Sequence, residues 1–146
     1  MPHSGAVVDC HEVTKVYRQG TQEVHALRGL TLEVAAGEFT AICGPSGSGK
    51  TTLLNLIGAL DRPSTGTIHL DGHDLGAMSQ RERSHLRRDR IGFVFQAYNL
   101  MPVLTAFENA EMVLALQGAP LEERRERVEK ILKDVGLEGL ERHSFS

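Results

Sequence analysis

The run Gly44-Pro45-Ser46-Gly47-Ser48-Gly49-Lys50-Thr51 carries the clearest chemistry in the sequence, because it fits the pattern G-x-x-x-x-G-K-[ST] at every fixed position. Glycines in such a run let the backbone curl, so that successive N–H groups point at phosphate oxygens. The ammonium of Lys50 can reach the terminal phosphates as a point charge, and the hydroxyl of Thr51 can ligate Mg²⁺. The pattern therefore predicts a phosphate-binding loop with a magnesium ion beside it.

This chemistry needs a strand before the loop and a helix after it. Phe39 to Cys43 is short, apolar and β-prone, and we predict a strand there. Thr51 to Ile57 is helix-forming, with Leu53, Leu54 and Ile57 expected on one face, and Thr52 joins the loop residues at the helix start. The helix N-terminus adds its dipole to the attraction for an anion. A Gly/Ser-rich turn without a ligand is the alternative, but the strand–loop–helix context favours the phosphate loop.

Bulk properties narrow the class of protein. The chain has 146 residues, enough for one domain with a real core. A net charge of −3 and a pI near 6.2 give no global electrostatic case for nucleic acid, so no nucleic-acid partner is expected. No stretch approaches the roughly 20 apolar residues needed to span a bilayer. Met1 to Asp9 lacks the basic start and apolar run of a signal peptide.

The two cysteines, Cys10 and Cys43, have neither CxxC nor Cys/His spacing, which argues against a zinc site. Because Cys43 lies in the predicted apolar strand, we expect it to be a buried free thiol. Cysteine usage of this kind is typical of the cytosol.

The first third of the sequence predicts β structure and the second half predicts mostly helix. Turn signals lie at 18–21 and 35–38, and Asp71-Gly72 is a turn pair. Further β-rich runs are predicted at 6–8, 13–17, 25–27, 30–34, 67–70 and 91–95.

Helices are predicted after Ser79, at 107–116 and at 121–135. Ser79 with Glu82 three residues later forms a capping-box pattern. In the last helix Val128, Ile131, Leu132 and Val135 follow a helical apolar period, and Gly136 fits a C-cap. The segment after Ser79 also carries a basic run, interpreted as a solvated helix face rather than a contact for anionic lipid or RNA: Arg81, Arg83, Arg87, Arg88 and Arg90.

Motifs around the loop occur in a characteristic order. Val16-Tyr17 lies upstream, Leu30 to Glu38 leads into the loop strand, Pro63 to Gly72 follows the helix, and Gly92-Phe93-Val94-Phe95-Gln96 comes later. This ordered set resembles the nucleotide-binding domain of ABC transporters from about Val7 to the end of the chain. Tyr98 to Asn109 resembles the branch that includes lipoprotein-release and macrolide-export ATPases.

The resemblance implies an α/β fold, the ABC type of phosphate-loop NTPase. It would have an N-terminal antiparallel β part, an incomplete parallel-sheet core and the start of a helical subdomain. Residues 1–146 would form a single nucleotide-binding domain that is incomplete at its C-terminus. Its β-rich part and phosphate-loop core would cover about 6–95, and its hinge loop and helical subdomain about 96–146.

For the nucleotide, the resemblance implies ATP and Mg²⁺. Tyr17 matches the aromatic residue that stacks on adenine, and Val24 would add apolar contact to the base. Gln96 matches the hinge glutamine, whose amide senses the γ-phosphate and the metal. Thr51 and Gln96 would therefore be the residues that hold Mg²⁺. An ordinary strand tyrosine and a surface glutamine are the alternatives that position alone leaves open.

For partners, the resemblance implies an integral membrane permease that contacts Ala97 to Thr105, and a second nucleotide-binding subunit. Tyr98, Leu100, Met101 and Leu104 suit either that partner surface or a small local core. The chain would then work at the cytoplasmic face of the cell membrane, held there by its partner.

The family continues into a Ser-Gly-Gly-Gln signature, a strand that ends in a metal-binding Asp and a catalytic Glu, and a switch His, and none of these occurs in the sequence. No catalytic residue is identifiable in the sequence. The resemblance therefore implies that a truncated chain of this kind would bind MgATP, whereas ATP hydrolysis by the chain alone is not expected. The leading interpretation is the ATP-binding subunit of an export transporter. A non-hydrolysing nucleotide-binding fragment is the alternative, followed by a soluble ABC-type protein of DNA repair or translation and by a small kinase.

Overall fold

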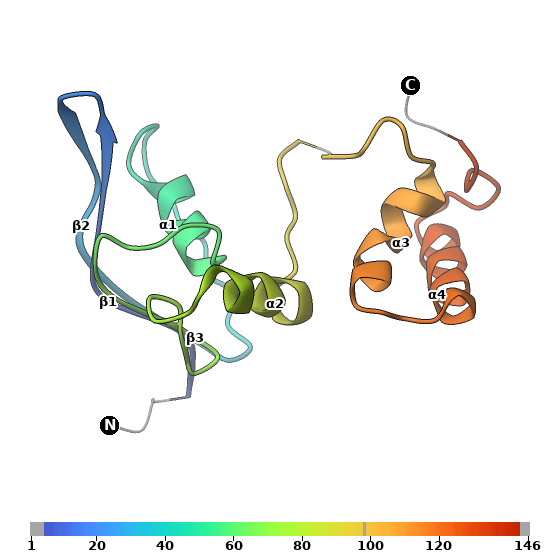
Figure 1. Cartoon of the computed structure of the whole chain (residues 1–146), viewed down its shortest axis with the longest axis horizontal. Coiled ribbons are helices and arrows are strands. Elements are labelled where there is room, and N and C mark those ends of the chain that lie inside the picture. The colour runs from blue at the N-terminus through green and yellow to red at the C-terminus, as the bar shows by residue number, and fades with distance from the viewer. Residues whose placement is uncertain (1–4, 98, 144–146) are drawn as a thin grey trace. The chain divides into compact units, whose positions relative to one another are not determined.

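The structure, a computed structural model, describes residues 5–97 and 99–143. They form two compact units, one ending at Arg87 and the other beginning at Arg88 (Figure 1). The elements are β1 (Ala6–Gln19), β2 (Gln22–Ala35), α1 (Lys50–Ile57), β3 (Thr65–Leu70), β4 (His73–Asp74), α2 (Gln80–Arg90), α3 (Ala106–Leu116) and α4 (Leu121–Asp134). Among the described residues, no helix has both the length and the apolar character needed to cross a membrane.

An antiparallel sheet with the strand order β2-β1-β3-β4 dominates the first unit. β1 and β2 form a long hairpin (Figure 1), joined at Gly20 with a φ of 62°. The register shifts between Cys10 and Val13, and again before Lys15 and Val16, so bulges interrupt the alternation of side chains. The sequence therefore suggested separate short runs where the structure has continuous strands, and the predicted antiparallel β part is confirmed.

The core of the first unit lies between the sheet and α1. Its buried apolar side chains are Val8, Cys10, Val13, Leu27, Leu53, Leu56, Ala59, Ile68, Leu70, Leu75 and Leu86. Within α1 the buried pair is Leu53 and Leu56, whereas the side chain of Leu54 is 56% exposed. Of the predicted apolar face, Leu53 is buried and Ile57 is half-buried, but the prediction is wrong for Leu54. Residues three apart share a helix face, and here the i, i+3 pair is the one that meets the sheet.

The predicted strand over Phe39–Cys43 is not formed. Phe39 is 97% exposed and Cys43 is an exposed free thiol, so the expected burial of Cys43 is wrong as well. A strand is stabilised by hydrogen bonds to a neighbouring strand, and no described residue supplies one for this segment.

The predicted strand over 91–95, in the second unit, is also not formed. The side chain of Val94 is fully exposed, and the rings of Phe93 and Phe95 stack on each other at 5.6 Å. As with residues 39–43, no strand of the described residues pairs with this segment, so no neighbouring strand stabilises it by hydrogen bonds. No parallel strand pair is present in the described part of the chain.

Helix α2 begins with the predicted capping box. The Ser79 amide donates to Glu82 Oε2 at 2.7 Å, and the Glu82 amide donates to Ser79 Oγ at 3.3 Å. The sequence suggested a solvated basic face on this helix, but Arg83 and Arg87 form hydrogen bonds within the fold. Arg83 donates to the carbonyl of Asp61 at 3.2 Å and Arg87 to that of Ala59 at 2.7 Å. The two guanidinium groups thus supply hydrogen-bond donors to carbonyl oxygens that follow the C-terminal end of α1.

The second unit is built around α3 and α4, which lie side by side (Figure 1). Thr105 caps α3 in a capping box with Glu108. In α4 only Val128 and Leu132 of the predicted apolar set are buried, while Ile131 and Val135 are more than half exposed. An ion pair of 3.0 Å joins Arg124 of α4 to Glu111 of α3. Gly136, with a φ of 77°, follows α4 as predicted.

Candidate functional site

The predicted phosphate loop leads directly into α1, whose N-cap is Gly49 with a φ of 89°. No side chain caps this helix, and its first turn contains no acidic residue. The amides of the first helical turn have no partner within a helix. Together with the helix dipole, they give the N-terminus of α1 a positive potential that favours an anion.

Lys50 folds back over the loop that precedes it. Its Nζ donates to the carbonyl oxygens of Gly44 and Pro45 at 2.8 and 2.7 Å, and to Ser48 Oγ at 3.4 Å. All three acceptors are neutral, and no carboxylate of the described residues forms an ion pair with Lys50. The ammonium is therefore held in place while its charge stays uncompensated, which suits it for a phosphate.

A depression of about 570 Å³ lies over the loop and the adjoining part of β2. Its lining residues are Val24, His25, Ala26, Ser46, Gly47, Ser48, Gly49, Lys50, Thr51 and Thr52. The structure thus brings the predicted base contact Val24 to the predicted phosphate loop. His25 and Ala26 were not predicted as site residues. Their signal was available, because they directly follow Val24 in the same predicted β region.

Tyr17 lies directly opposite Val24 in the register of β1 and β2. Directly opposed residues of an antiparallel pair project to the same face of the sheet, so the two predicted base contacts are neighbours. The side chain of Tyr17 is 36% exposed, which leaves ring surface accessible.

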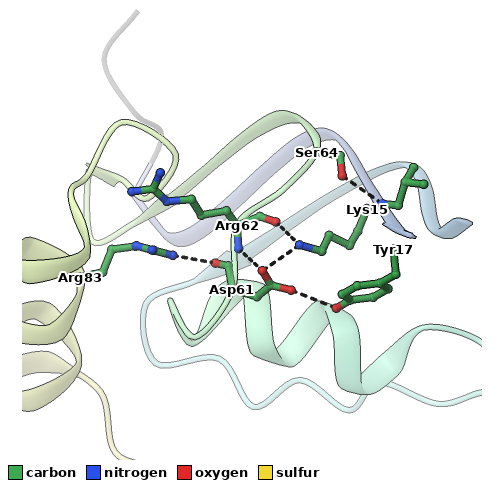
Figure 2. Close-up of polar contacts among 7 residues, drawn as sticks. Lys15, Tyr17, Asp61, Arg62, Ser64 and Arg83 are labelled. Carbon is green, nitrogen blue, oxygen red and sulfur yellow. Dashed lines mark hydrogen bonds and ion pairs between the residues drawn. The ribbon is translucent and has the colours of Figure 1, made fainter. Parts of the chain in front are cut away.

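The hydroxyl of Tyr17 donates to Asp61 Oδ2 at 3.0 Å (Figure 2). Lys15 Nζ lies 4.9 Å from the centre of the Tyr17 ring and donates to Asp61 Oδ1 at 2.7 Å. Burial raises the pKa of Asp61, but hydrogen bonds from Lys15, the Arg62 amide and Tyr17 outweigh it, so the net pKa is lowered and the carboxylate is ionised. Lys15 and Asp61 were not predicted as site residues. Lys15 lies two residues before Tyr17 on β1, whereas only the tertiary fold brings Asp61 to Tyr17.

Gln96 and the predicted permease contact 97–105 belong to the second unit. Gln96 is exposed, and its predicted action on the nucleotide stays a prediction. Leu100 and Met101 are 38% and 50% exposed and Leu104 is half-buried, so these three do not form a closed local core. Tyr98 lies outside the described residues.

For the metal, the described residues contain no group of three His, Cys, Asp or Glu side chains that could hold an ion. The available ligand at the loop is the hydroxyl of Thr51, which is exposed in the first turn of α1. A single hydroxyl next to a phosphate site fits Mg²⁺, which keeps several waters and takes substrate phosphate oxygens as ligands.

The chain is similar to known proteins of one family. Residues 27–146 match the family described as ABC transporter. The chain is 46% identical over 131 residues to an uncharacterized ABC transporter ATP-binding protein of Thermotoga maritima, covering 90% of this chain and 56% of the relative. It is 45% identical to the lipoprotein-releasing system ATP-binding protein LolD of Pseudomonas fluorescens, covering 90% of this chain and 58% of the relative.

Among solved structures, the dimeric post-hydrolysis structure of the ATP-binding cassette MJ0796 bound to ADP and Pi is similar. MJ0796 comes from Methanocaldococcus jannaschii. The TM-score is 0.86 at 42% identity, over 94% of this chain and 61% of that chain. The chain spans little more than half the length of the relatives from Thermotoga maritima and Pseudomonas fluorescens. From the family match, these identities and the shared fold, the chain belongs to the ABC transporter family.

Proposed function

We propose that the chain binds MgATP at the loop 44–52 and serves as the ATP-binding part of an export transporter. The observation that carries this proposal is the uncompensated Lys50 ammonium at the uncapped N-terminus of α1. The depression beside it has room for phosphates, and Val24 at its rim faces the same side of the sheet as Tyr17. The triphosphate would lie on the loop and the base near Tyr17.

Each part of the site then has a distinct task. The backbone N–H groups of the loop and the first turn of α1 bind phosphate oxygens, while Lys50 neutralises negative charge on the terminal phosphates. The hydroxyl of Thr51 would ligate Mg²⁺, and when bound the ion bridges phosphate oxygens and offsets their charge. The amide of Gln96 is proposed as a further contact to the same ion.

Hydrolysis would also need a group that orients or deprotonates the attacking water. We assign no described side chain to that task, and we propose ATP turnover for the complete transporter rather than for these residues alone. A non-hydrolysing nucleotide-binding fragment remains the alternative. Hydrolysis by the isolated chain, abolished by a substitution at Lys50, would contradict this division of tasks.

The proposed partners are a membrane permease, contacted through 97–105, and a second nucleotide-binding subunit. Relatives support the export branch by name: one is a lipoprotein-releasing system protein and another, from Marinobacter nauticus, is a macrolide export ATP-binding/permease protein. Exposed Leu100 and Met101 supply apolar surface for such a contact. The chain would then work at the inner face of the cell membrane, held there by the permease.

Isothermal titration calorimetry with MgATP tests the binding proposal on the chain and on Lys50→Ala. We expect the substitution to weaken binding at least about tenfold, because it removes a charge-assisted contact to phosphate. Lys133→Ala is the matched control, since it also removes one positive charge but from an exposed ion pair with Glu138 on the other unit. Equal affinities for both variants, or no binding by the unsubstituted chain, would contradict the proposal.

A further inference from the structure

A polar cluster ties β1 to the segment that follows α1. Figure 2 shows Lys15 and Tyr17 of β1 pointing at Asp61, with Arg62, Ser64 and Arg83 around them. The two carboxylate oxygens of Asp61 have separate partners. Oδ1 accepts from Lys15 Nζ and from the Arg62 amide, each at 2.7 Å, and Oδ2 accepts from the Tyr17 hydroxyl at 3.0 Å. The phenol end of Tyr17 is therefore fixed by a charge-assisted hydrogen bond.

The ring of Tyr17 is fixed from a second side as well. The ammonium of Lys15 lies 4.9 Å from the ring centre, within the range of a cation–π contact. Its side chain is only 12% exposed, and the ion pair with Asp61 holds it there. With the ammonium on one face of the ring, a flat base can stack on the opposite face only.

Asp61 is itself held rigidly. The guanidinium of Arg83 donates to the carbonyl oxygen of Asp61 at 3.2 Å. The backbone amide of Asp61 donates to the carbonyl oxygen of Asn55 in α1 at 3.2 Å. Ser64, three residues later, accepts from the Val16 amide at 3.0 Å. The carboxylate is thus fixed to both α1 and β1, and α1 begins at the phosphate loop. The ring of Tyr17 and the phosphate loop are consequently positioned by one connected piece of structure.

We propose that Asp61 is a positioning residue for the base of a bound nucleotide, which holds the ring of Tyr17 in one orientation with Lys15 on its far face. The inference rests on the proposed function, because it concerns the base half of the same site. A ring whose orientation is fixed before binding stacks on a base with higher affinity, since ordering a side chain on binding reduces affinity. Phosphate contacts do not involve this cluster, so its loss will weaken only the part of the affinity that depends on the base.

The experiment compares two ligands, MgATP and magnesium tripolyphosphate, which carry the same chain of phosphates with and without a nucleoside. Dissociation constants are measured by calorimetry for the unsubstituted chain, Asp61→Ala, Tyr17→Phe and the double variant. We expect each single substitution to weaken MgATP binding about fivefold, the worth of one hydrogen bond. Tripolyphosphate binding should stay within about twofold. The double variant should be no weaker than either single variant, because both remove the same contact.

Glu23→Gln is the matched control. Glu23 lies on the same hairpin and forms an exposed ion pair with Arg18 at 3.1 Å, outside the cluster. Loss of a nearby carboxylate favours an anionic ligand by simple electrostatics, so this variant should bind MgATP equally well or better. Removal of the negative charge of Asp61 should by itself also strengthen MgATP binding. A weaker MgATP affinity in Asp61→Ala therefore cannot be explained by the change in charge.

Three results would overturn the inference: unchanged MgATP affinity in Asp61→Ala, an equal loss for both ligands, or additive losses in the double variant. Tyr17→Phe keeps the ion pair of Lys15 and Asp61, so it decides the question if Asp61→Ala does not fold. Failure of the proposed function gives a different pattern, in which the unsubstituted chain binds neither ligand and Lys50→Ala changes nothing.

Discussion

Gly49 of the proposed phosphate loop and Ala26 of β2 lie so close together that only a glycine fits. A Cβ placed on Gly49 would lie 2.5 Å from the carbonyl oxygen of Ala26, well inside van der Waals contact. Gly49 also has a φ of 89°, a conformation that residues with a Cβ rarely adopt. This contact seats the loop against the hairpin whose residues Tyr17 and Val24 are the predicted base contacts.

Gly49→Ala should therefore destabilise the protein and displace the loop. We expect a loss of about 2–3 kcal/mol in the free energy of unfolding, from backbone strain together with the steric clash. Urea denaturation followed by circular dichroism measures it. Gly47→Ala is the control, because Gly47 has a φ of 80° but a methyl group there would meet nothing within 4 Å, so this variant carries only the strain. Equal losses in the two variants would show that the Ala26 contact has no energetic weight.

The two cysteines should differ sharply in reactivity. Cys43 is exposed, whereas Cys10 is fully buried, and burial together with the charge of Asp9 raises the pKa of Cys10 to about 11. Since the thiolate is the reactive form, at pH 8 iodoacetamide should modify Cys43 quickly and Cys10 only after unfolding. Peptide mass spectrometry distinguishes the sites. Bound MgATP should slow the reaction of Cys43, which directly precedes Gly44. Rapid modification of Cys10 in the folded chain would contradict the packing of β1.

The cap of α3 should contribute measurably to stability. Thr105 accepts from the Glu108 amide at 3.2 Å and donates to the Glu108 carboxylate at 2.9 Å. Thr105→Ala should cost about 1 kcal/mol and lower the urea midpoint of the second unit. Thr21→Ala, in the exposed β1–β2 turn, is the control and should stay within about 0.5 kcal/mol of the parent. A midpoint equal to that of the control would rule out a stabilising cap.

The pKa of Asp61 predicts how its contribution to stability changes with acid. The net pKa lies below the ordinary value of 3.8 in the folded protein, so folding favours the ionised form. Its contribution is fully present above pH 3.8 and is lost as the pH falls through the lower folded pKa. The difference in unfolding free energy between the parent and Asp61→Asn should therefore be constant near neutral pH and shrink in stronger acid. A difference that grew on acidification would contradict the assigned direction.

Local signals predicted local structure well. The pair Ser79 and Glu82 predicted the capping box at α2, because both partners lie within one helical turn of each other. Asp71-Gly72 predicted the turn between β3 and β4, where both residues have positive φ values of 48° and 76°. The loop 44–51 was predicted from its spacing and from the strand and helix expected around it, and the helix, which begins at Lys50, is confirmed.

Features that depend on distant partners could not be predicted in the same way. The apolar runs 39–43 and 91–95 were predicted as strands, but a strand needs a neighbour, and composition does not show which segment supplies it. The contact between Tyr17 and Asp61 spans 44 positions in the sequence and carries no local pattern. Leu56 was missed on α1 because either of two adjacent helix faces satisfied the apolar spacing.

The exposed segment 39–43 also affects how the protein behaves in concentrated solution. It is apolar and β-prone, the side chain of Phe39 is 97% exposed, and no strand of the described residues occupies its hydrogen-bonding groups. An apolar, β-prone segment without a neighbouring strand is a template for strand addition by another chain. We therefore expect self-association through this segment at high protein concentration, and a charged residue in place of Phe39 would act as a gatekeeper against it.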